Sequence, residues 1–592
     1  MRKSSRRRHY YIENIRHSHV TRYHGPGSIF VNGEGVSMMI CGFPSWKKSF
    51  NSDSSKTISE NIEDLAIRDT YLENVLGIGR IIAPPINESQ NNVPKGWLIP
   101  AIRFPLAHYC TNTNCRRISF DFDHGDSKPS SCKECKRTAS ASKLRQIPLF
   151  IGCKDGHIQE IDWDGLCHGA NLCPSGASKL KFFPEANYLY SKVSCLSCGS
   201  SATVDKISKK QCNGHRPWHP NFSNDICNND ASIHEAPSAN AYYAQTTSAI
   251  VIPPTGNLVP AIMQSLRASR EIRTLRNAGW EGNAANLEAI QKILLNRGFE
   301  LSLKETEHHL RALLDRQNGS DDIHQIELDA FTEARGRTNG LYGEPDLIVE
   351  PINFENVPNS NLFSLVRASA LPRLRFISVL TGFSRFNPQV IDKQMGFHQL
   401  WGTEPETLFQ EGQNCPEWLL GIEAFGEGLF FEFDVETLPV VSNIEKYGRV
   451  NIEINKIKKI FIHTISHLLI RVAAERSGFS LPSIRERLYL DGEKAAILLY
   501  VISPDLEGTN GGLVELAKET EFDDLLKTAI ELSTWCTSDP VCLEGFEFDN
   551  GNELKGACHH CVLLPETSCE LNNQFLDRAY VLARFQSLLR PS

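Results

Sequence analysis

The stretch from residue 556 to residue 570 reads GACHHCVLLPETSCE and places a Cys-x-x-Cys pair, Cys558 and Cys561, in a short polar turn. Cys542 lies upstream and Cys569 downstream. A set of two, one and one thiols suits a tetrahedral zinc ion. Cys536 is an extra thiol beside Cys542, and it is either a competing fourth ligand or a buried cysteine at a helix end. The sequence predicts a zinc set of Cys542, Cys558, Cys561 and Cys569, with Cys536 as the alternative to Cys542.

The segment that precedes this turn has α/β character. Apolar residues at helical spacing predict a long helix over residues 455–477, and the run AAILLYVI predicts a strand over 495–502. A Gly-rich loop at 508–512 then opens a helix that runs toward Trp535, and a last helix is expected over 572–588.

A second cysteine block lies in the first half of the chain. Cys110-x4-Cys115 and Cys132-x2-Cys135 are separated by 16 residues, with the strand-like run 118–122 between them. This is the spacing of a zinc ribbon, and four thiolates leave no open position for chemistry. We therefore expect a structural zinc ion at this ribbon.

Residues 147–235 carry a further set of cysteines and histidines. The sequence favours one four-thiol set of Cys195, Cys198, Cys212 and Cys227, with His215 as a competing ligand. An additional site is open and would draw on the nearby residues Cys153, His157, Cys167, His168 and Cys173. The alternative is that these histidines satisfy buried backbone groups near Trp163 and that the cysteines fill the core.

Composition places the chain among globular proteins. It has 592 residues, 41% hydrophobic and 22% charged, with a formal net charge of −8 and 18 cysteines. The basic N-terminus is followed by no apolar run typical of a secretory signal, and no apolar stretch is long enough to cross a membrane. Thiols in x2 and x4 pairs then favour zinc in a reducing cytoplasm over disulfides; Cys41 and Cys415 stand alone and are expected to be buried.

The chain is expected to fold as a mixed α+β protein of several domains. We predict a mostly β region at 1–104, a cysteine-rich zinc-ribbon region at 105–236, a helical region at 237–345, a mixed linker region at 346–450 and an α/β zinc-binding domain at 451–592. Within the helical region, Arg267, Arg270, Arg273 and Arg276 form a basic stripe that could meet phosphates or simply lie solvated.

Signs of catalysis are few. His463 and His467 share a helix face, but Thr464 stands where a zincin carries its general base, Glu. The loop 508–512 lacks the Gly-Lys-Ser/Thr ending of a Walker loop, although a strand–loop–helix start can bind anions. The sequence thus predicts a protein without its own ATPase motor and with no catalytic residues.

Several motifs together resemble the DrmB family of DISARM antiphage systems. They are residues 22–29 and 38–43, the Cys153-x3-His157 and Cys195-x2-Cys198 pairs, and the stretch 212–218. The end of the chain, with residues 463–467, 511–513 and 557–561, is similar to the MrfA-type zinc-binding domain, which occurs in DrmB and in certain DNA helicases.

The resemblance implies a function that composition does not give. DrmB proteins associate with the helicase DrmA, and the pair engages phage DNA. We therefore expect a non-catalytic, zinc-binding partner of a DrmA-like helicase that helps bind or load foreign DNA. Two other interpretations stay open: a metal-dependent nuclease or hydrolase using His463 and His467, and a stand-alone DNA-binding protein.

Overall fold

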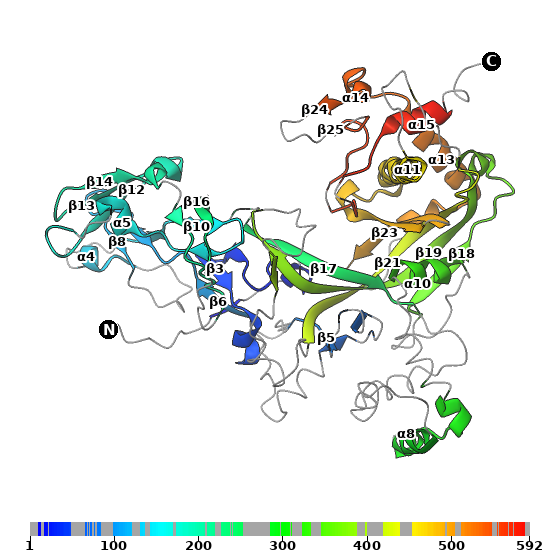
Figure 1. Ribbon diagram of the computed structural model, residues 1–592, viewed down its shortest axis with the longest axis horizontal. Coiled ribbons are helices and arrows are strands. Elements are labelled where there is room, and N and C mark those ends of the chain that lie inside the picture. The colour runs from blue at the N-terminus through cyan, green and yellow to red at the C-terminus, as the bar shows by residue number, and fades with distance from the viewer. Residues whose placement is uncertain are drawn as a thin grey trace. The chain divides into compact units, whose positions relative to one another are not determined.

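The computed structural model divides the chain into two compact units, residues 1–248 with 378–422 and residues 249–377 with 423–592 (Figure 1). The residues that the structure describes are 10–12, 17–21, 23–48, 65–67, 69, 72–73, 76, 78, 80–84, 99–120, 131–136, 142–169, 173–207, 210–219, 226–236, 238, 241–252, 284–296, 298–307, 310, 323–332, 345–386, 397–399, 418–438, 444, 453–491, 494–503, 511–547, 553–554, 556–565, 567–571 and 573–585. The predicted basic stripe at Arg267–Arg276, the basic N-terminal tail, Cys415 and residues 508–510 lie outside them.

The first unit begins with an antiparallel sheet in the order β1-β6-β3-β2. Its strands are β1 (Tyr10–Ile12), β6 (Ile99–Arg103), β3 (Ser37–Ile40) and β2 (Ile29–Val31), and the helices beside them in sequence are α1 (His17–Val20) and η1 (Phe43–Lys48). Strands β2 and β3 form a hairpin around residues 32–35, in which Ile29 pairs with Met39. Asn32 Oδ1 accepts the amide of Val36 at 2.9 Å and Gly35 takes φ 75°, which closes the turn.

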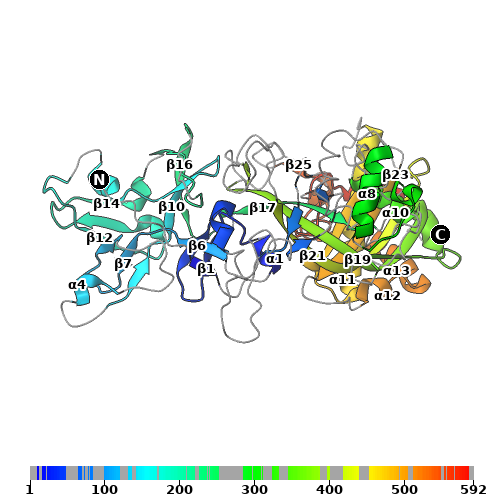
Figure 2. The same ribbon diagram turned by 90° about the horizontal axis from the view of Figure 1, so that it is seen from below.

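The cysteine-rich region of this unit is built from short strands in small sheets (Figure 1 and Figure 2). They are β8-β7-β9 (Ile118–Ser119, His108–Cys110, Leu144–Gln146), β11-β10-β16-β15 (Ile158–Gln159, Leu149–Cys153, Asp230–Glu235, Lys210–Gln211) and β12-β13-β14 (Leu180–Phe183, Lys192–Cys195, Ser201–Thr203). Between them lie α4 (Lys133–Lys136), α5 (Trp163–His168), η2 (Tyr188–Tyr190) and η3 (Val204–Lys206). Sheets this small bury little apolar surface, so they need another source of stability.

Two long strands, β19 (Leu365–Ser384) and β21 (Trp418–Phe433), contribute residues to both units. In the first unit the start of β21 pairs in parallel with β5 (Arg80–Ile82), and the end of β19 pairs with β20 (Phe397–Gln399). β4 (Ala66–Ile67) pairs with β5, and β17 (Tyr243–Ile250) belongs to the same sheet as β19 and β21.

The second unit is a sheet with helices packed against it. The end of β21 pairs with β23 (Lys494–Ser503), which pairs with β22 (Ile484–Asp491), and β18 (Leu347–Pro351) pairs with β19. Its helices are α8 (Ala284–Asn296), α10 (Ile323–Thr332), η5 (Pro358–Phe363), α11 (Ile454–Ser477), η8 (Leu481–Ser483), α12 (Gly512–Glu515), α13 (Glu519–Ser533), α14 (Val541–Glu544) and α15 (Arg578–Phe585), and β24 (Phe546–Glu547) pairs with β25 (Glu553–Leu554).

Helix α11 is the centre of this unit and contacts α13, α15, β22 and β23 (Figure 1). It matches the helix predicted over 455–477, and the predicted stripe Phe461, Ile465, Leu468 and Val472 is buried. Because residues on nearly every side of the helix are buried, it is a core helix and not a surface helix.

The mixed α+β fold with cysteine clusters in its first half and a helical stretch in the middle is confirmed. In α8, Leu287, Ile290 and Leu294 are buried along one face. The five predicted region boundaries stay a prediction. Among the described residues, none of the helices has the length and apolar character to span a bilayer.

Candidate metal centres

Five groups of cysteine, histidine and acidic side chains could each hold a metal ion, counted over the described residues. Within each group the potential ligand atoms all lie within 4.8 Å of one another. The groups are Cys110, Cys115, Cys132 and Cys135; Cys153, His157, Cys212 and Cys227; His168, Cys173, Cys195 and Cys198; Cys536, Cys542, Cys558 and Cys561; and His463, His467, Glu486 and Cys569.

The first group brings together the four thiols predicted for the zinc ribbon. The Cys110 and Cys135 sulfurs are 3.6 Å apart, and the Cys115 and Cys132 sulfurs are 3.9 Å apart. Strand β7 ends at Cys110, and α4 carries Cys135. Four ligands around a zinc ion with Zn–S bonds of about 2.3 Å stand about 3.8 Å apart, so these spacings fit.

The predicted four-thiol set of Cys195, Cys198, Cys212 and Cys227 is not brought together. Its two pairs lie in different groups, and each pair is completed by one cysteine and one histidine of the residues left open above. The reason is strand pairing: β10 pairs with β16, and this places Cys153 beside Cys227, with their sulfurs 4.0 Å apart.

The second group also contains His157, whose Nδ1 is 3.5 Å from the Cys153 sulfur. The amide of Gly214 donates to the Cys212 sulfur at 3.3 Å, as in a metal-binding knuckle. His215, the competing candidate, is outside the groups found among the described residues.

The third group joins Cys173 and Cys195, whose sulfurs are 3.8 Å apart, to Cys198 and His168. His168 Nε2 is 3.3 Å from the Cys198 sulfur, and its Nδ1 lies 3.0 Å from the carbonyl oxygen of Asp164. An Nδ1–H donated to that carbonyl leaves Nε2 as the ligand atom, a common second-shell arrangement. Burial alone would raise the pKa of Cys195, but backbone hydrogen bonds at Lys179, Cys198 and Ser197 and the His168 side chain lower it to about 6.

Cys167 does not join a group, and its thiol is 3.2 Å from the carbonyl oxygen of Ser200. For this residue the core-filling alternative describes the observed position.

The C-terminal group contains Cys536 and Cys542 together with the Cys-x-x-Cys pair. The Cys536 sulfur is 3.4 Å from Cys558, and the Cys542 sulfur is 3.6 Å from Cys561. The choice between Cys536 and Cys542 therefore does not arise, because the structure brings both to the pair. Cys569, the predicted fourth member, lies instead with His463, His467 and Glu486.

Two arginines lie beside the C-terminal thiols. Arg471 Nη2 donates to the carbonyl oxygens of His559 and Leu563, at 3.0 and 2.8 Å, and Arg578 is buried and donates to the Ser533 carbonyl at 3.0 Å. The Cys542 thiol, with a smaller contribution from the Arg578 charge, lowers the pKa of Cys561 to about 5. This setting favours the thiolate at Cys561, the form that binds metal, while the pKa of its hydrogen-bond partner Cys542 is raised.

The sulfur spacings also exclude disulfides between the neighbouring thiols described here. The shortest sulfur pair is 3.4 Å, whereas a disulfide bond is about 2.05 Å long. All the described cysteines are free.

The remaining sequence candidates have ordinary structural roles. The amide of Leu513, at the helix start after the Gly-rich loop, donates to Glu427 Oε1 at 2.8 Å, so the protein's own carboxylate takes this donor.

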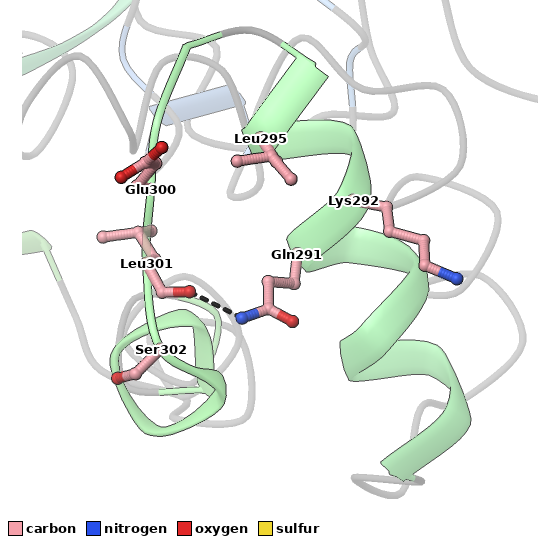
Figure 3. Close-up of a pocket in the computed structure, with 6 residues that line it drawn as sticks. All are labelled: Gln291, Lys292, Leu295, Glu300, Leu301 and Ser302. Carbon is pink, nitrogen blue, oxygen red and sulfur yellow. Dashed lines mark hydrogen bonds between the residues drawn. The ribbon is translucent and has the colours of Figure 1, made fainter.

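A surface cavity of about 400 Å³ beside α8 is lined by Gln291, Lys292, Leu295, Glu300, Leu301 and Ser302 (Figure 3). In it Gln291 donates to the Leu301 carbonyl, and its lining holds no cysteine or histidine.

Comparison with known proteins adds to this geometry. Residues 465–562 match the model of the MrfA Zn-binding domain, and this range includes all four thiols of the C-terminal group. The chain contains an MrfA Zn-binding domain. Residues 16–243 match a domain of unknown function, DUF8724.

The chain is also 26% identical over 536 residues to the DISARM protein DrmB of Bacillus paralicheniformis, a match that covers 83% of this chain and 90% of that protein. The resemblance to the DrmB family is confirmed. The crystal structure of the DUF1998 helicase MrfA bound to DNA matches 42% of this chain at 10% identity with a TM-score of 0.21, and the match covers 27% of that helicase chain.

Proposed function

We propose that this chain is a zinc-stabilised, non-catalytic component of a DISARM-type antiphage defence system. The observation that carries the proposal is the MrfA Zn-binding domain whose four thiols converge at the C-terminal end, in a chain that matches a DISARM protein over most of its length. The finer proposal, which rests on the family resemblance, is that it partners a DrmA-like helicase and helps that complex bind or load foreign DNA.

Zinc in this proposal has a structural role. Three or four thiolates with no more than one histidine fill the tetrahedral coordination of a zinc ion and leave no position for a substrate. The proposed ligands are Cys110, Cys115, Cys132 and Cys135; Cys153, His157, Cys212 and Cys227; His168, Cys173, Cys195 and Cys198; and Cys536, Cys542, Cys558 and Cys561. Each ion would link the separate segments that carry its ligands and so add to the free energy of folding.

A double substitution distinguishes two separate sites from one four-thiol site in residues 147–235. We expect Cys195→Ser combined with Cys212→Ser to remove two zinc equivalents, because the two cysteines lie in different groups. A single site of Cys195, Cys198, Cys212 and Cys227 would lose only one equivalent. Cys167→Ser is the matched control and should retain all the zinc; the measurement is metal content by mass spectrometry.

A hydrolytic function at His463 and His467 is less well supported. Both histidines and Glu486 are at most 3% exposed, and Cys569 is 6% exposed, so a nucleic acid could not reach them in this conformation. Nuclease activity of the purified chain that is lost in His467→Ala would restore that alternative.

The partnership can be tested by co-expression. We expect the chain to co-purify with a DrmA-like helicase encoded beside it and the complex to bind DNA at least tenfold more tightly than the chain alone, since a net charge of −8 disfavours polyanions. A chain that binds DNA equally well by itself, with the usual salt dependence, would favour the stand-alone DNA-binding protein instead.

A further inference from the structure

The fifth group lies in the second unit, where three separate segments meet. Helix α11 carries His463 and His467 one turn apart, β22 carries Glu486, and the segment before α15 carries Cys569. The imidazole rings of the two histidines are 4.5 Å apart. Since residues four apart share a helix face, both rings turn toward the same strand.

Both imidazoles direct Nε2 toward one carboxylate oxygen. His463 Nε2 lies 3.0 Å from Glu486 Oε1 and 3.3 Å from the Cys569 sulfur. His467 Nε2 lies 3.4 Å from the same oxygen. Two nitrogens, one oxygen and one sulfur therefore face a common point.

The proton positions at His467 make this arrangement unusual for a plain hydrogen-bond network. His467 Nδ1 is 2.9 Å from the carbonyl oxygen of Val562, which can only accept, so Nδ1 carries a proton. In the neutral ring, Nε2 then carries a lone pair that faces the carboxylate oxygen of Glu486. Within the described chain this nitrogen has no hydrogen-bond partner. A cation between the two groups would turn this repulsion into attraction.

The Glu486 and Cys569 ligand atoms are also oriented by outer partners, whereas His463 Nδ1 has no hydrogen-bond partner among the described residues. Ser466 Oγ donates to Glu486 Oε2, and the amide of Glu570 donates to Glu486 Oε1 at 3.2 Å. The amide of Asn573 donates to the Cys569 sulfur at 3.1 Å. Hydrogen bonds from a second shell that fix each ligand are typical of metal centres.

Charge and donor type define which ion would fit. One thiolate and one carboxylate supply two negative charges, which balance a divalent cation in a buried place. Two imidazole nitrogens and a thiolate suit zinc and exclude calcium or magnesium, which require oxygen ligands.

We propose that His463, His467, Glu486 and Cys569 form a second metal centre of the second unit, which binds one structural zinc ion and ties the segment before α15 to α11 and β22. The matched zinc-binding domain, residues 465–562, includes neither His463 nor Cys569, so this centre extends beyond it. The inference is independent of the helicase partnership.

Anomalous diffraction from crystals of the unmodified full chain is the direct test. Data collected on both sides of the zinc absorption edge should give a peak between these four side chains, in addition to peaks at the cysteine-rich groups. Peaks at the cysteine-rich groups with none at this position would overturn the proposal, whatever the behaviour of variants.

Metal content of variants gives a second readout. Cys569→Ala and the double variant His463→Gln with His467→Gln should each lose one zinc equivalent relative to the parent chain. His560→Gln is the control, because His560 is exposed in the nearby Cys-x-x-Cys turn and lies outside the groups. Folded variants that keep the parent zinc content would contradict the assignment.

Discussion

Replacing Cys558 with serine is expected to unfold the C-terminal zinc module and to remove one zinc equivalent. The Cys558 sulfur is 3.4 Å from Cys536 and 3.6 Å from Cys561, so it occupies the middle of the thiol group. A structural zinc ion contributes on the order of 10 kcal/mol to the folding of a small module. Domains are typically stable by only about 5–15 kcal/mol, so the module should not remain folded without it.

Unfolding of the zinc module should also destabilise the core of the second unit. Cys536 follows α13 and Cys542 lies in α14, and Cys542, Cys561 and Cys536 belong to the same hydrophobic cluster as α11 and α15. We expect limited proteolysis to cut the variant within residues 534–547 and 556–565 more readily than the parent chain.

His559→Gln is the matched control for this experiment. His559 is adjacent to Cys558, but its side chain is exposed and lies outside the metal groups of the described residues. It should therefore keep the parent zinc content and protease resistance. A Cys558→Ser chain with an unchanged zinc content and the same resistance would refute the structural role of this thiol group.

Much of the second unit could be predicted because its signals are local. The helical spacing of Phe461, Ile465, Leu468 and Val472 gave α11 almost to its ends, and a run of apolar residues gave β23. Local spacing also gave the zinc ribbon, since Cys110 and Cys115 lie on one knuckle and Cys132 and Cys135 on the other. Two complete pairs in a short segment leave few other ways to assemble four ligands.

The pairing of knuckles in residues 147–235 could not be read from spacing. Cys212 meets Cys153 and His157 because β16 returns to pair with both β10 and β15, and the contacts between β10 and β16 link residues more than 50 positions apart. Such register depends on the whole sheet. The available signal was the cluster of Cys153, His157, His168 and Cys173, which left an additional site open but did not show how it divides between two groups.

The position of Cys569 also depends on contacts between residues far apart in the sequence. The Glu486 amide donates to the carbonyl of Ser568, and the Glu570 amide donates back to the Glu486 side chain, which holds this segment along β22. Cys569 is thereby drawn to the histidines and away from Cys558. Glu486 itself had no sequence signal, because a Glu between Arg485 and Arg487 is typical of a solvated strand face, and only the contact of the strand with α11 brings it to the histidines.

Replacing Glu327 with leucine is expected to destabilise the second unit by about 3–5 kcal/mol, the usual effect of breaking a buried ion pair. Glu327, in α10, is 1% exposed, and its Oε2 lies 2.6 Å from Arg487 Nε and 2.9 Å from the Tyr489 hydroxyl. Its Oε1 accepts the amide of Ile250 at 2.8 Å. The substitution thus removes a carboxylate that forms an ion pair with Arg487 and accepts hydrogen bonds from Tyr489 and Ile250.

The loss of stability in Glu327→Leu should be independent of metal binding at the proposed centre, although both involve strand β22. Arg487 follows Glu486 in β22, and successive strand residues point to opposite faces, so Glu327 acts on the face away from α11. We therefore expect Glu327→Leu to lower the urea midpoint of unfolding while the zinc content stays at the parent value.

A double-substitution cycle shows whether the ion pair is the cause. Adding Arg487→Met to Glu327→Leu removes the buried charge that has lost its carboxylate, so the double variant should be more stable than Glu327→Leu alone. Glu327→Gln is the matched control, since its amide oxygen still accepts hydrogen bonds and the expected loss is smaller. If Glu327→Leu unfolds at the parent midpoint, the contacts of Glu327 do not hold α10 to β22; if the double variant is less stable than the single one, Arg487 stabilises the unit through other partners.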